Sequence, residues 1–199
     1  MSKNKVTFGL EKVHIAFADE TTTGKLTWKQ PIPIPGAVRW TPEAQGESST
    51  FYADNTAYFV VSSNNGYTGE LEVALVPDEV LAEMMGWEID KNGMLVEVSD
   101  AIPKKFALLG QVQGDKRNRR FVYYNCQASR PAKERKTKAE SVEVNTDILN
   151  LSISPIEIGG KMLVKGDLEL NEANAEAYNA FFASVYIPSF TTSAGGGES

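Results

Sequence analysis

The sequence contains few of the residues from which enzymes build catalytic or metal sites. Its 199 residues include one histidine, His14, and one cysteine, Cys126. A Ser-His-Asp or Cys-His arrangement would have to be built around these two, yet each stands in a segment patterned as a strand, where free cysteine readily packs in a core. One residue of each kind cannot form a zinc site, and no Asp-x-Asp-x-Asp-Gly calcium loop occurs. We therefore expect no catalytic residues, no metal site and no intramolecular disulfide.

Cofactor and membrane signals are missing as well. Neither Gly-x-Gly-x-x-Gly nor the phosphate-binding pattern Gly-x-x-x-x-Gly-Lys-Ser/Thr occurs, so the sequence implies no nucleotide cofactor. No apolar run approaches the roughly 20 residues that cross a bilayer. The first residues also lack the basic, apolar and small-residue order of a secretory signal. We expect a protein without cofactors that is used without export and away from membranes.

Two pairs of acidic residues are the remaining candidates for hydrolytic chemistry. Glu70 and Glu72 are spaced by two, as are Asp167 and Glu169, in segments patterned as strands. This spacing places both members of a pair on one face of a strand. Two carboxylates on one face could form a hydrolytic dyad, but we favour a solvated strand face for both pairs.

The residues that the sequence does contain are typical of one β-rich globular domain. Hydrophobic residues make up 42% and charged residues 23%, which is ordinary for a folded chain. Short runs rich in Val, Ile, Thr, Phe and Tyr recur about every ten residues, separated by Gly, Pro, Asn or Asp. We expect a mainly β (α+β) fold with a single domain over residues 1–188 and a flexible tail over 189–199.

Period-two alternation and turn residues predict the individual strands. One hairpin is expected between 58–61 and 69–75 across the Asn-Gly step at 65–66, and a second between 106–112 and 121–128. Other strands and turns are predicted at 6–10, 13–17 and 141–153, the last with an irregularity near Leu149, and at the polar turns 19–24 and 90–93.

Two helices are predicted from their end signals. Pro77, followed by acids at 78 and 79 and closed by Gly86, delimits a short helix. Asn171 is a capping candidate for a second helix that extends to about Tyr186, since apolar residues are spaced by four and Pro188 follows.

Two segments predict extended structure outside the core. Residues 41–50 are polar and lack an apolar period, so we expect a long exposed loop there. Three prolines within 30–36 hold that segment extended and remove backbone donors, which predicts an edge or an arm rather than a central strand.

Charge is unevenly distributed along the chain. Residues 111–140 hold nine Lys or Arg against three acids, a local charge of +6; because the whole chain carries −6, the remainder carries −12. Basic runs at 116–120 and 133–138 bracket the aromatic strand at 121–124, which suggests a nucleic-acid-binding module over 116–138 as an alternative function. We favour strand-end turns or contacts with acidic surfaces of another subunit, because an acidic protein repels nucleic acid on average.

Several separate strings resemble one family. They are Phe-Gly-Leu-Glu-Lys-Val-His at 8–14, Pro-Ile-Pro-Gly-Ala-Val at 33–38, Phe-Tyr-Ala-Asp-Asn-Thr-Ala-Tyr-Phe at 51–59, the run 63–75, Phe-Ala-Leu-Leu at 106–109, Tyr-Asn-Cys at 124–126 and Ala-Ser-Arg-Pro at 128–131. Their order and spacing over about residues 5–186 resemble the major tail protein, or tail tube protein, of long-tailed, non-contractile bacteriophages and prophages of Gram-positive bacteria. The basic turn at 116–120 and the glycine-rich end depart from the family pattern.

The resemblance implies a structural protein of the virion rather than an enzyme. It implies a β-sandwich or barrel-like core with one flanking helix beside a second, short helix, six subunits per ring that join their sheets into one inner barrel, and rings stacked into a tube for DNA ejection. It further implies partners such as tape measure, terminator and distal tail proteins, assembly in the host cytoplasm, and DNA that passes through the lumen without specific binding. An acidic wall suits this passage, because cations on the wall would hold phosphates by releasing their counterions.

These expectations lead to hypotheses about particular residues. The loop at 41–50 is predicted to reach an adjacent ring, with 30–36 and the C-terminal segment acting as arms. The residues expected in this ring-stacking contact are Trp40, Glu43, Glu47, Phe51 and Tyr52. The residues expected in basic contacts between subunits, away from the lumen, are Lys116, Arg117, Arg119, Arg120, Lys133, Arg135, Lys136 and Lys138.

Overall fold

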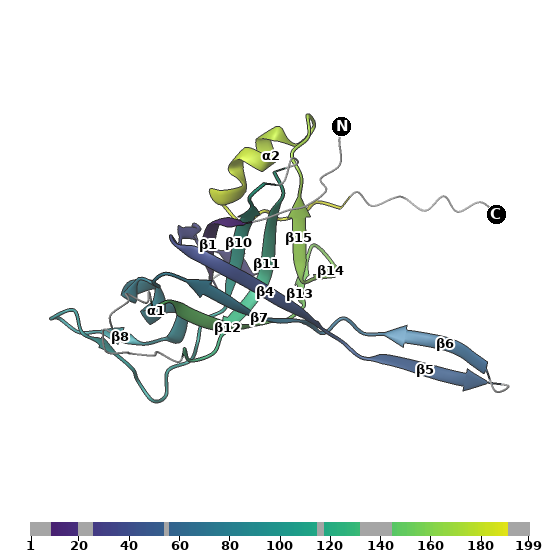
Figure 1. Cartoon of the computed structure of the whole chain (residues 1–199), viewed down its shortest axis with the longest axis horizontal. Coiled ribbons are helices and arrows are strands. Elements are labelled where there is room, and N and C mark those ends of the chain that lie inside the picture. Colours follow the sequence, from purple (N-terminus) through teal and green to yellow (C-terminus); the bar gives the residue numbers. More distant parts are fainter. Residues whose placement is uncertain (1–8, 20–25, 54–55, 115–117, 132–144, 191–199) are drawn as a thin grey trace, which may run out of the picture.

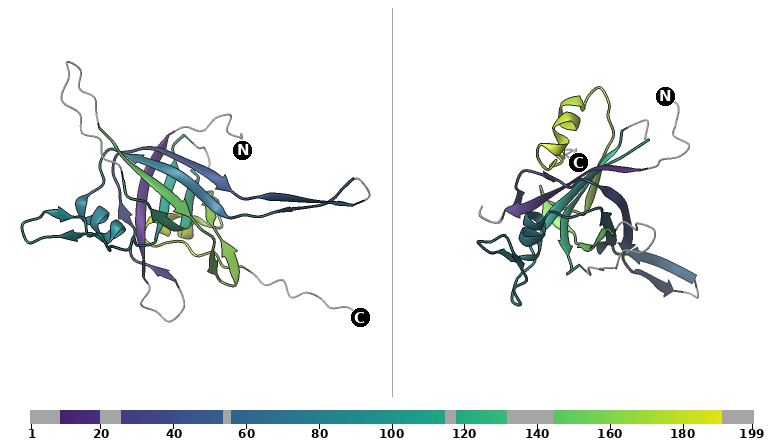
Figure 2. Two further views of the ribbon diagram at one scale, coloured as in Figure 1. Left: turned by 90° about the horizontal axis from the view of Figure 1, so that it is seen from below. Right: turned by 60° about the vertical axis from the view of Figure 1, so that its left-hand side comes forward.

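The computed structural model describes residues 9–19, 26–53, 56–114, 118–131 and 145–190, with the backbone alone over 48–53 and 56–62. Figure 1 shows a β-rich body from which one long hairpin projects, and Figure 2 shows the same hairpin from two other sides. All strand pairs in this part of the chain are antiparallel.

The body is built around a nine-stranded sheet with the order β2-β1-β10-β11-β12-β7-β4; β3 also pairs with β1, and β15 with β11. The sheet does not close into a barrel within the described residues, because its order has two ends. Its strands are β1 Leu10–Asp19, β2 Thr27–Trp28, β3 Ile32–Pro33, β4 Ala37–Gln45, β7 Gly66–Val73, β10 Phe106–Val112, β11 Arg120–Ala128, β12 Asp147–Ile153 and β15 Lys165–Leu168.

Three two-stranded hairpins and two helices complete the described elements. The hairpins are β5 Ser48–Ala53 with β6 Thr56–Ser62, β8 Glu88–Ile89 with β9 Leu95–Val96, and β13 Ile156–Ile158 with β14 Lys161–Leu163. The helices are α1 Asp78–Met85 and α2 Ala175–Asn179, the latter continued by the 3-10 turn η1 Ala180–Phe182. The mainly β fold with a short and a flanking helix is thus confirmed.

The central strands are buried on both faces and divide the apolar residues between two cores. In β1, Ile15 and Phe17 enter the larger core, while Ala16 between them faces a smaller core. The larger core contains α1, and the smaller one lies between β10, β11 and the α2 region. Strands β10 and β11 are buried along almost their whole length. Burial of each large apolar side chain contributes about 1.5–3 kcal/mol, which holds these strands between two packed layers.

Helix α1 has the ends that its sequence predicts. Pro77 precedes the first residue, Asp78 and Glu79 occupy the first turn, and Gly86 ends the helix in the left-handed conformation with φ 72°. Four of the buried side chains are Val80, Leu81, Met84 and Met85. The turn at 90–93 and the pairing of β10 with β11 are confirmed too.

The second helix is much shorter than predicted. The Asn171 side-chain oxygen accepts hydrogen bonds from the N–H groups of Ala173 and Asn174, 2.9 and 3.0 Å away. This Asx turn holds 171–174 outside the helix, which begins only at Ala175. Beyond Phe182 the chain leaves the helical path, although Val185 still enters the smaller core.

The prediction of a loop over 41–50 is wrong. Residues 37–45 form β4, which pairs with β7 over its whole length, and β5 begins at Ser48. The segment lacks an apolar period because the part of β4 that follows Trp40 is largely exposed and the next strand projects from the body (Figure 1). Strands that cover no core need no apolar alternation.

The predicted hairpin between 58–61 and 69–75 is also wrong. Strand β6 pairs with β5, whereas β7 pairs with β4 and β12. Gly66 does have the positive φ that its Asn-Gly step predicts, 97°, but it joins two consecutive strands of one long bent hairpin. Residues 54–55, between β5 and β6, lie outside the described residues.

The remaining segments agree with the sequence in part. The predicted strand 141–153 appears as β12, with 141–144 outside the described residues, and the irregularity expected near Leu149 is not found because its register with β7 is unbroken. Segment 30–36 contributes the two-residue β3 beside β1, as an edge should. The predicted strand 6–10 and the turn 19–24 fall largely outside the described residues.

Candidate functional surfaces

His14 and Cys126 play structural parts. The His14 ring stacks on Phe182, with centroids 4.6 Å apart, and its Nδ1 lies 2.9 Å from the Lys12 carbonyl oxygen. Cys126 is fully buried in the larger core, and this burial raises the pKa of its thiol far above the usual range. Among the described residues, no group of three or more His, Cys, Asp or Glu could hold a metal ion.

A polar face covers the outer side of β4, β7 and β12. Because directly paired residues point to the same side of an antiparallel sheet, the registers of these strands place their side chains in three rows. The rows are Arg39, Glu72 and Ile148; Thr41, Glu70 and Asn150; and Glu43, Thr68 and Ser152. We call these nine residues the polar face.

The other side of the same three strands is apolar. Trp40 pairs with Leu71, and Leu71 pairs with Leu149, which places all three against the larger core. Seven of the nine residues of the polar face, all except Glu72 and Ile148, line a shallow hollow of roughly 570 Å³ together with Gly69, Ser129 and Leu151. Side chains alternate between the two faces of a strand. The residues of the polar face therefore point outward, because the residues next to them in each strand point toward the larger core.

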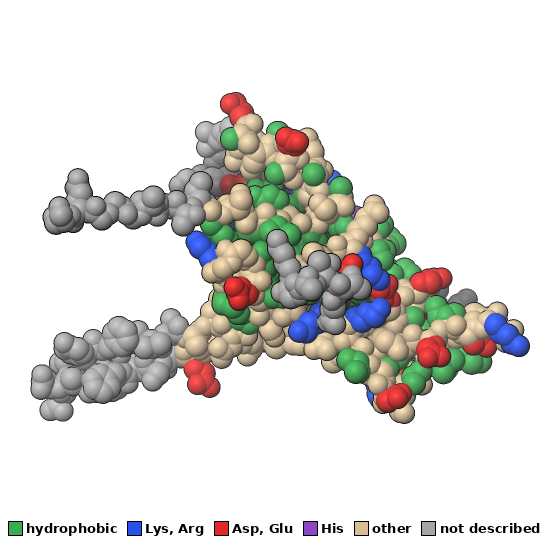
Figure 3. All heavy atoms as spheres, turned by 180° about the vertical axis from the view of Figure 1, so that it is seen from behind, with side chains coloured by type: hydrophobic (Ala, Val, Ile, Leu, Met, Phe, Trp, Pro, Cys, Tyr) green, Lys and Arg blue, Asp and Glu red, His purple; other side chains and the backbone are tan. Residues whose placement is uncertain are grey.

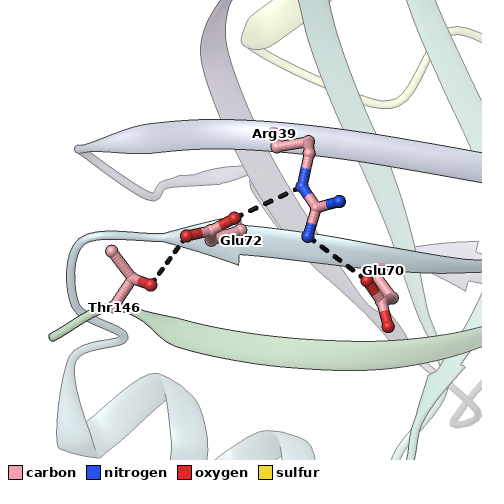
Figure 4. A network of polar contacts seen from close by, with 4 residues as sticks. All are labelled: Arg39, Glu70, Glu72 and Thr146. Atoms are coloured by element: carbon pink, nitrogen blue, oxygen red, sulfur yellow. Dashed lines mark hydrogen bonds and ion pairs between the residues drawn. The ribbon is translucent and has the colours of Figure 1, made fainter.

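Arg39 is held between two glutamates on the polar face (Figure 4). Its Nε donates to a carboxylate oxygen of Glu72 and its Nη2 to one of Glu70, each over 3.3 Å. The Thr146 hydroxyl donates to the other Glu72 oxygen over 2.7 Å. Glu70 and Glu72 thus share a face, as their spacing predicts. Exposed ion pairs contribute only about 0–1 kcal/mol each, so these contacts chiefly fix the position and neutralise the charge of the guanidinium.

The second acidic pair is divided. Asp167 is an exposed residue of β15 whose Oδ2 lies 3.7 Å from the Lys165 ammonium. Glu169 follows the end of β15 and forms an ion pair with Arg119. The two carboxylates therefore have different partners, and neither arrangement resembles a hydrolytic dyad.

The residues predicted for ring stacking occupy three different places. Trp40 packs against Tyr123 in the larger core, with ring centroids 5.4 Å apart. Glu43 belongs to the polar face, and Glu47 lies at the base of the projecting hairpin, where its carbonyl oxygen accepts the Ser63 N–H over 2.9 Å. Phe51 and Tyr52 lie in β5, within that hairpin.

The two described members of the basic set have partners within their own chain. Arg120 is 9% exposed, donates to the Gln111 side chain over 2.9 Å and to the Tyr178 carbonyl oxygen, and stacks over the Tyr178 ring at 3.7 Å. Arg119 pairs with Glu169. The others, namely Lys116, Arg117, Lys133, Arg135, Lys136 and Lys138, lie outside the described residues.

Sequence reasoning missed the polar face as a unit. The Glu70 and Glu72 spacing was visible, but Arg39 and Asn150 join them only through strand pairing over long stretches of chain.

Figure 3 shows the side of the molecule turned away from the viewer of Figure 1, where hydrophobic side chains gather on the upper body. Within the described residues, no helix has the length and apolarity needed to span a bilayer.

Comparisons with known proteins give a family match and a structural likeness. A search of curated protein sequences finds no match. Among solved structures, a chain of the cryo-EM structure of the anti-feeding prophage baseplate, 6-fold symmetrised, aligns with 10% sequence identity and a TM-score of 0.43, over 85% of this chain and 98% of that chain.

The family model described as "Phage tail tube protein" matches residues 1–193. This match covers nearly the whole sequence and confirms the resemblance to a phage tail tube protein. Members of this family are structural components of phage tails rather than enzymes, and the chain belongs to the phage tail tube protein family.

Proposed function

We propose that this protein is the repeating subunit of a phage tail tube. Six copies join into a ring, and stacked rings enclose the channel through which DNA is ejected into the host. The family match over residues 1–193 carries the proposal. Assembly takes place in the host cytoplasm with tape measure, terminator and distal tail proteins. Residues 1–188 act as one domain, with 189–199 as a tail.

Open sheet edges support self-association. In the described part of the chain, β4 is hydrogen-bonded only to β7 and β15 only to β11, so each leaves one edge without a strand. Unpaired N–H and C=O groups along an edge favour pairing with another chain, and closure of a ring removes such edges altogether. Strand β4, with nine residues, is the longer of the two edges.

The projecting hairpin supports contact with a neighbouring subunit or ring. Strands β5 and β6 pair only with each other in the described residues and extend away from the body (Figure 1). An isolated two-stranded hairpin is marginally stable in water. A surface on another copy would supply the packing that the hairpin lacks. The ring-stacking role predicted for a loop over 41–50 is accordingly assigned to this hairpin.

The alternative function, nucleic-acid binding through 116–138, receives less support. Arg120 cannot reach a phosphate without leaving the contacts that bury it, and Arg119 is paired with Glu169. Phosphate binding depends on cations that are free to displace counterions. The basic residues outside the described part still permit the alternative, so it needs a direct test.

Electron microscopy of the purified protein tests the proposal. We expect tubes of uniform diameter under negative stain, and no shift of labelled duplex DNA in a gel at moderate salt. A protein that stays monomeric at all concentrations and shifts DNA would overturn the tube assignment and favour the nucleic-acid-binding module.

A further inference from the structure

We propose that the polar face lines the bore of the tube, and that Glu70 and Glu72 hold Arg39 so that passing DNA phosphates do not bind it. This inference rests on the proposed function and adds to it the surface that faces the duplex. The occupant of the channel beside this face is double-stranded DNA that slides past without a binding site.

The polar face is open in the folded subunit. Thr41, Glu43, Glu70, Asn150 and Ser152 are all exposed, while the opposite side of their strands packs into the larger core. Strands β4, β7 and β12 therefore present an apolar side to the larger core and a polar side to the surroundings of the subunit. Those surroundings are either another subunit or a water-filled space.

The composition of the polar face favours water over a protein partner. It contains three carboxylates and one guanidinium among hydroxyl and amide side chains, and Ile148 is its one large apolar residue. Buried centres of protein interfaces are instead depleted in Glu and enriched in aromatic residues. Burying Glu43 without a cationic partner would also cost several kcal/mol in desolvation. The face suits the wall of an aqueous channel.

The charges of the polar face suit a channel for DNA in particular. One positive and three negative charges give it a net charge of −2 per subunit. Copies of the face around a ring would repel phosphates, while their hydroxyl and amide groups keep the wall hydrated. Cationic groups would do the reverse, because they bind phosphates with release of counterions.

Arg39 is the one cation on this face, and its geometry neutralises it. Two of its nitrogens already donate to carboxylates, and Glu72 is itself fixed by Thr146. A guanidinium is well suited to bidentate contacts with phosphate. Without the two glutamates, every subunit would offer one such group to the DNA. We call the contacts of Glu70 and Glu72 with Arg39 the clamp. These exposed ion pairs contribute little to stability, so a variant without them should still fold and can be tested.

Cysteine labelling locates the face. Because Cys126 is buried and its thiol unreactive, a new cysteine can be labelled selectively in Thr41→Cys or Asn150→Cys tubes. A small maleimide–biotin should react in intact tubes, but streptavidin, which is wider than a DNA duplex, should capture the biotin only after the tubes dissociate. Glu176→Cys is the matched exposed position expected to be captured on intact tubes, because α2 packs over β1, β10 and β11 at the smaller core rather than over the strands of the polar face.

Three labelling outcomes would overturn the inference. Capture of Thr41→Cys on intact tubes as fully as of Glu176→Cys would place the face outside. Protection from the small reagent in tubes alone would place it in a subunit contact. Failure of both Thr41→Cys and Asn150→Cys to assemble, while wild-type tubes form, would likewise place the polar face in a subunit contact. Absence of wild-type tubes would instead refute the proposed function, and the inference with it.

A charge experiment tests the clamp. Tubes of Glu70→Gln/Glu72→Gln should retain a short fluorescent duplex in sedimentation at low salt roughly tenfold more than wild type, and salt should release it. The triple variant with Arg39→Gln added should return to the wild-type level. Glu172→Gln/Glu176→Gln removes the same charge near α2 and should leave retention unchanged. Equal retention by the double variant and wild type, or by the double and triple variants, would refute the clamp.

Discussion

Arg120 connects the main sheet to α2 through its guanidinium. The group stacks over Tyr178 at 3.7 Å and over Phe182 at 4.7 Å, while it donates to Gln111 in β10. Gln111 in turn donates to Glu11 in β1 over 2.7 Å. A buried charge is tolerated when its donors are satisfied and its faces are covered. The Arg120 side chain therefore links the main sheet to the α2 region and does not belong to a solvated basic run.

Replacing Arg120 with lysine should destabilise the protein by about 1–3 kcal/mol, because an ammonium keeps the charge but loses the planar fork and the stacking surface. Urea unfolding followed by circular dichroism measures the difference. Arg130→Lys is the matched control: its side chain is 71% exposed and pairs with Glu97, so we expect a change within about 0.5 kcal/mol. Equal urea midpoints for Arg120→Lys and Arg130→Lys would refute the stabilising role of the Arg120 contacts.

The burial of Arg120 was beyond the reach of the sequence, for a physical reason. A run of Lys and Arg between two strands is usually a solvated turn, and Lys116 to Arg120 has that composition. What buries Arg120 is α2, which packs over the start of β11 from about 60 residues further along the chain. Such a tertiary contact leaves no local trace in the pattern of residues.

At the scale of elements, local signals predicted those structures whose cause is local. Proline, acids and glycine delimited α1, and short apolar runs on either side of a polar turn predicted β10 and β11. The hairpin β5–β6 was missed because its strands leave the body, where apolar alternation is not required. The polar face was missed because its rows depend on the registers of β4, β7 and β12.

Gly66 marks the bend between β6 and β7. Its φ is 97°, and a Cβ built on it would lie 1.8 Å from the Ile153 carbonyl oxygen. Gly66→Ala should therefore lower the free energy of unfolding by more than about 2 kcal/mol, measured by urea unfolding. In Gly93→Ala the new Cβ meets nothing within 4 Å and only its φ of 82° is strained, so a loss near 1 kcal/mol is expected. Similar losses of unfolding free energy in Gly66→Ala and Gly93→Ala would contradict the close contact between Gly66 and the Ile153 carbonyl oxygen.

Helix α1 is tied to the sheet by Glu83. Its carboxylate contacts Lys29 at 2.6 Å and Lys104 at 3.3 Å. Partial burial opposes ionisation, but hydrogen bonds and charge attraction from the two lysines outweigh it and hold the pKa of Glu83 below its usual 4.5. The ionised form therefore stabilises the fold above about pH 4.5, and this contribution disappears as the pH falls through the lower folded-state pKa.

Glu83→Gln should accordingly reduce stability at pH 7 and cease to matter in strong acid. We expect a loss below about 1 kcal/mol, because the lysines are half exposed and solvent screens the pairs. Urea midpoints of both proteins at pH 7 and pH 3 check this, and the difference between them should shrink at the lower pH. A difference that is constant or grows with acidity would contradict the assignment.

For the molecule as a whole, folding and assembly use separate parts of the chain. Most of the described core residues come from the main sheet, α1, β13 and the α2 region, and the hairpin β5–β6 stands apart from them (Figure 2). A subunit built this way can fold alone and still keep an element that finds its packing only in a neighbour.

Replacing residues 48–62 with Asn-Gly should therefore abolish long tubes while leaving the body folded. Glu47 and Ser63, the two residues to be joined, are already hydrogen-bonded, since the Ser63 N–H donates to the Glu47 carbonyl oxygen over 2.9 Å. A two-residue Asn-Gly turn can connect such a pair. Deletion of 43–49 would be a poorer test, because it removes part of β4 from the sheet. We expect an unchanged urea midpoint and no long tubes by electron microscopy. Tubes of normal length would show that ring stacking uses other surfaces, of which the open edges of β4 and β15 are then the first to test.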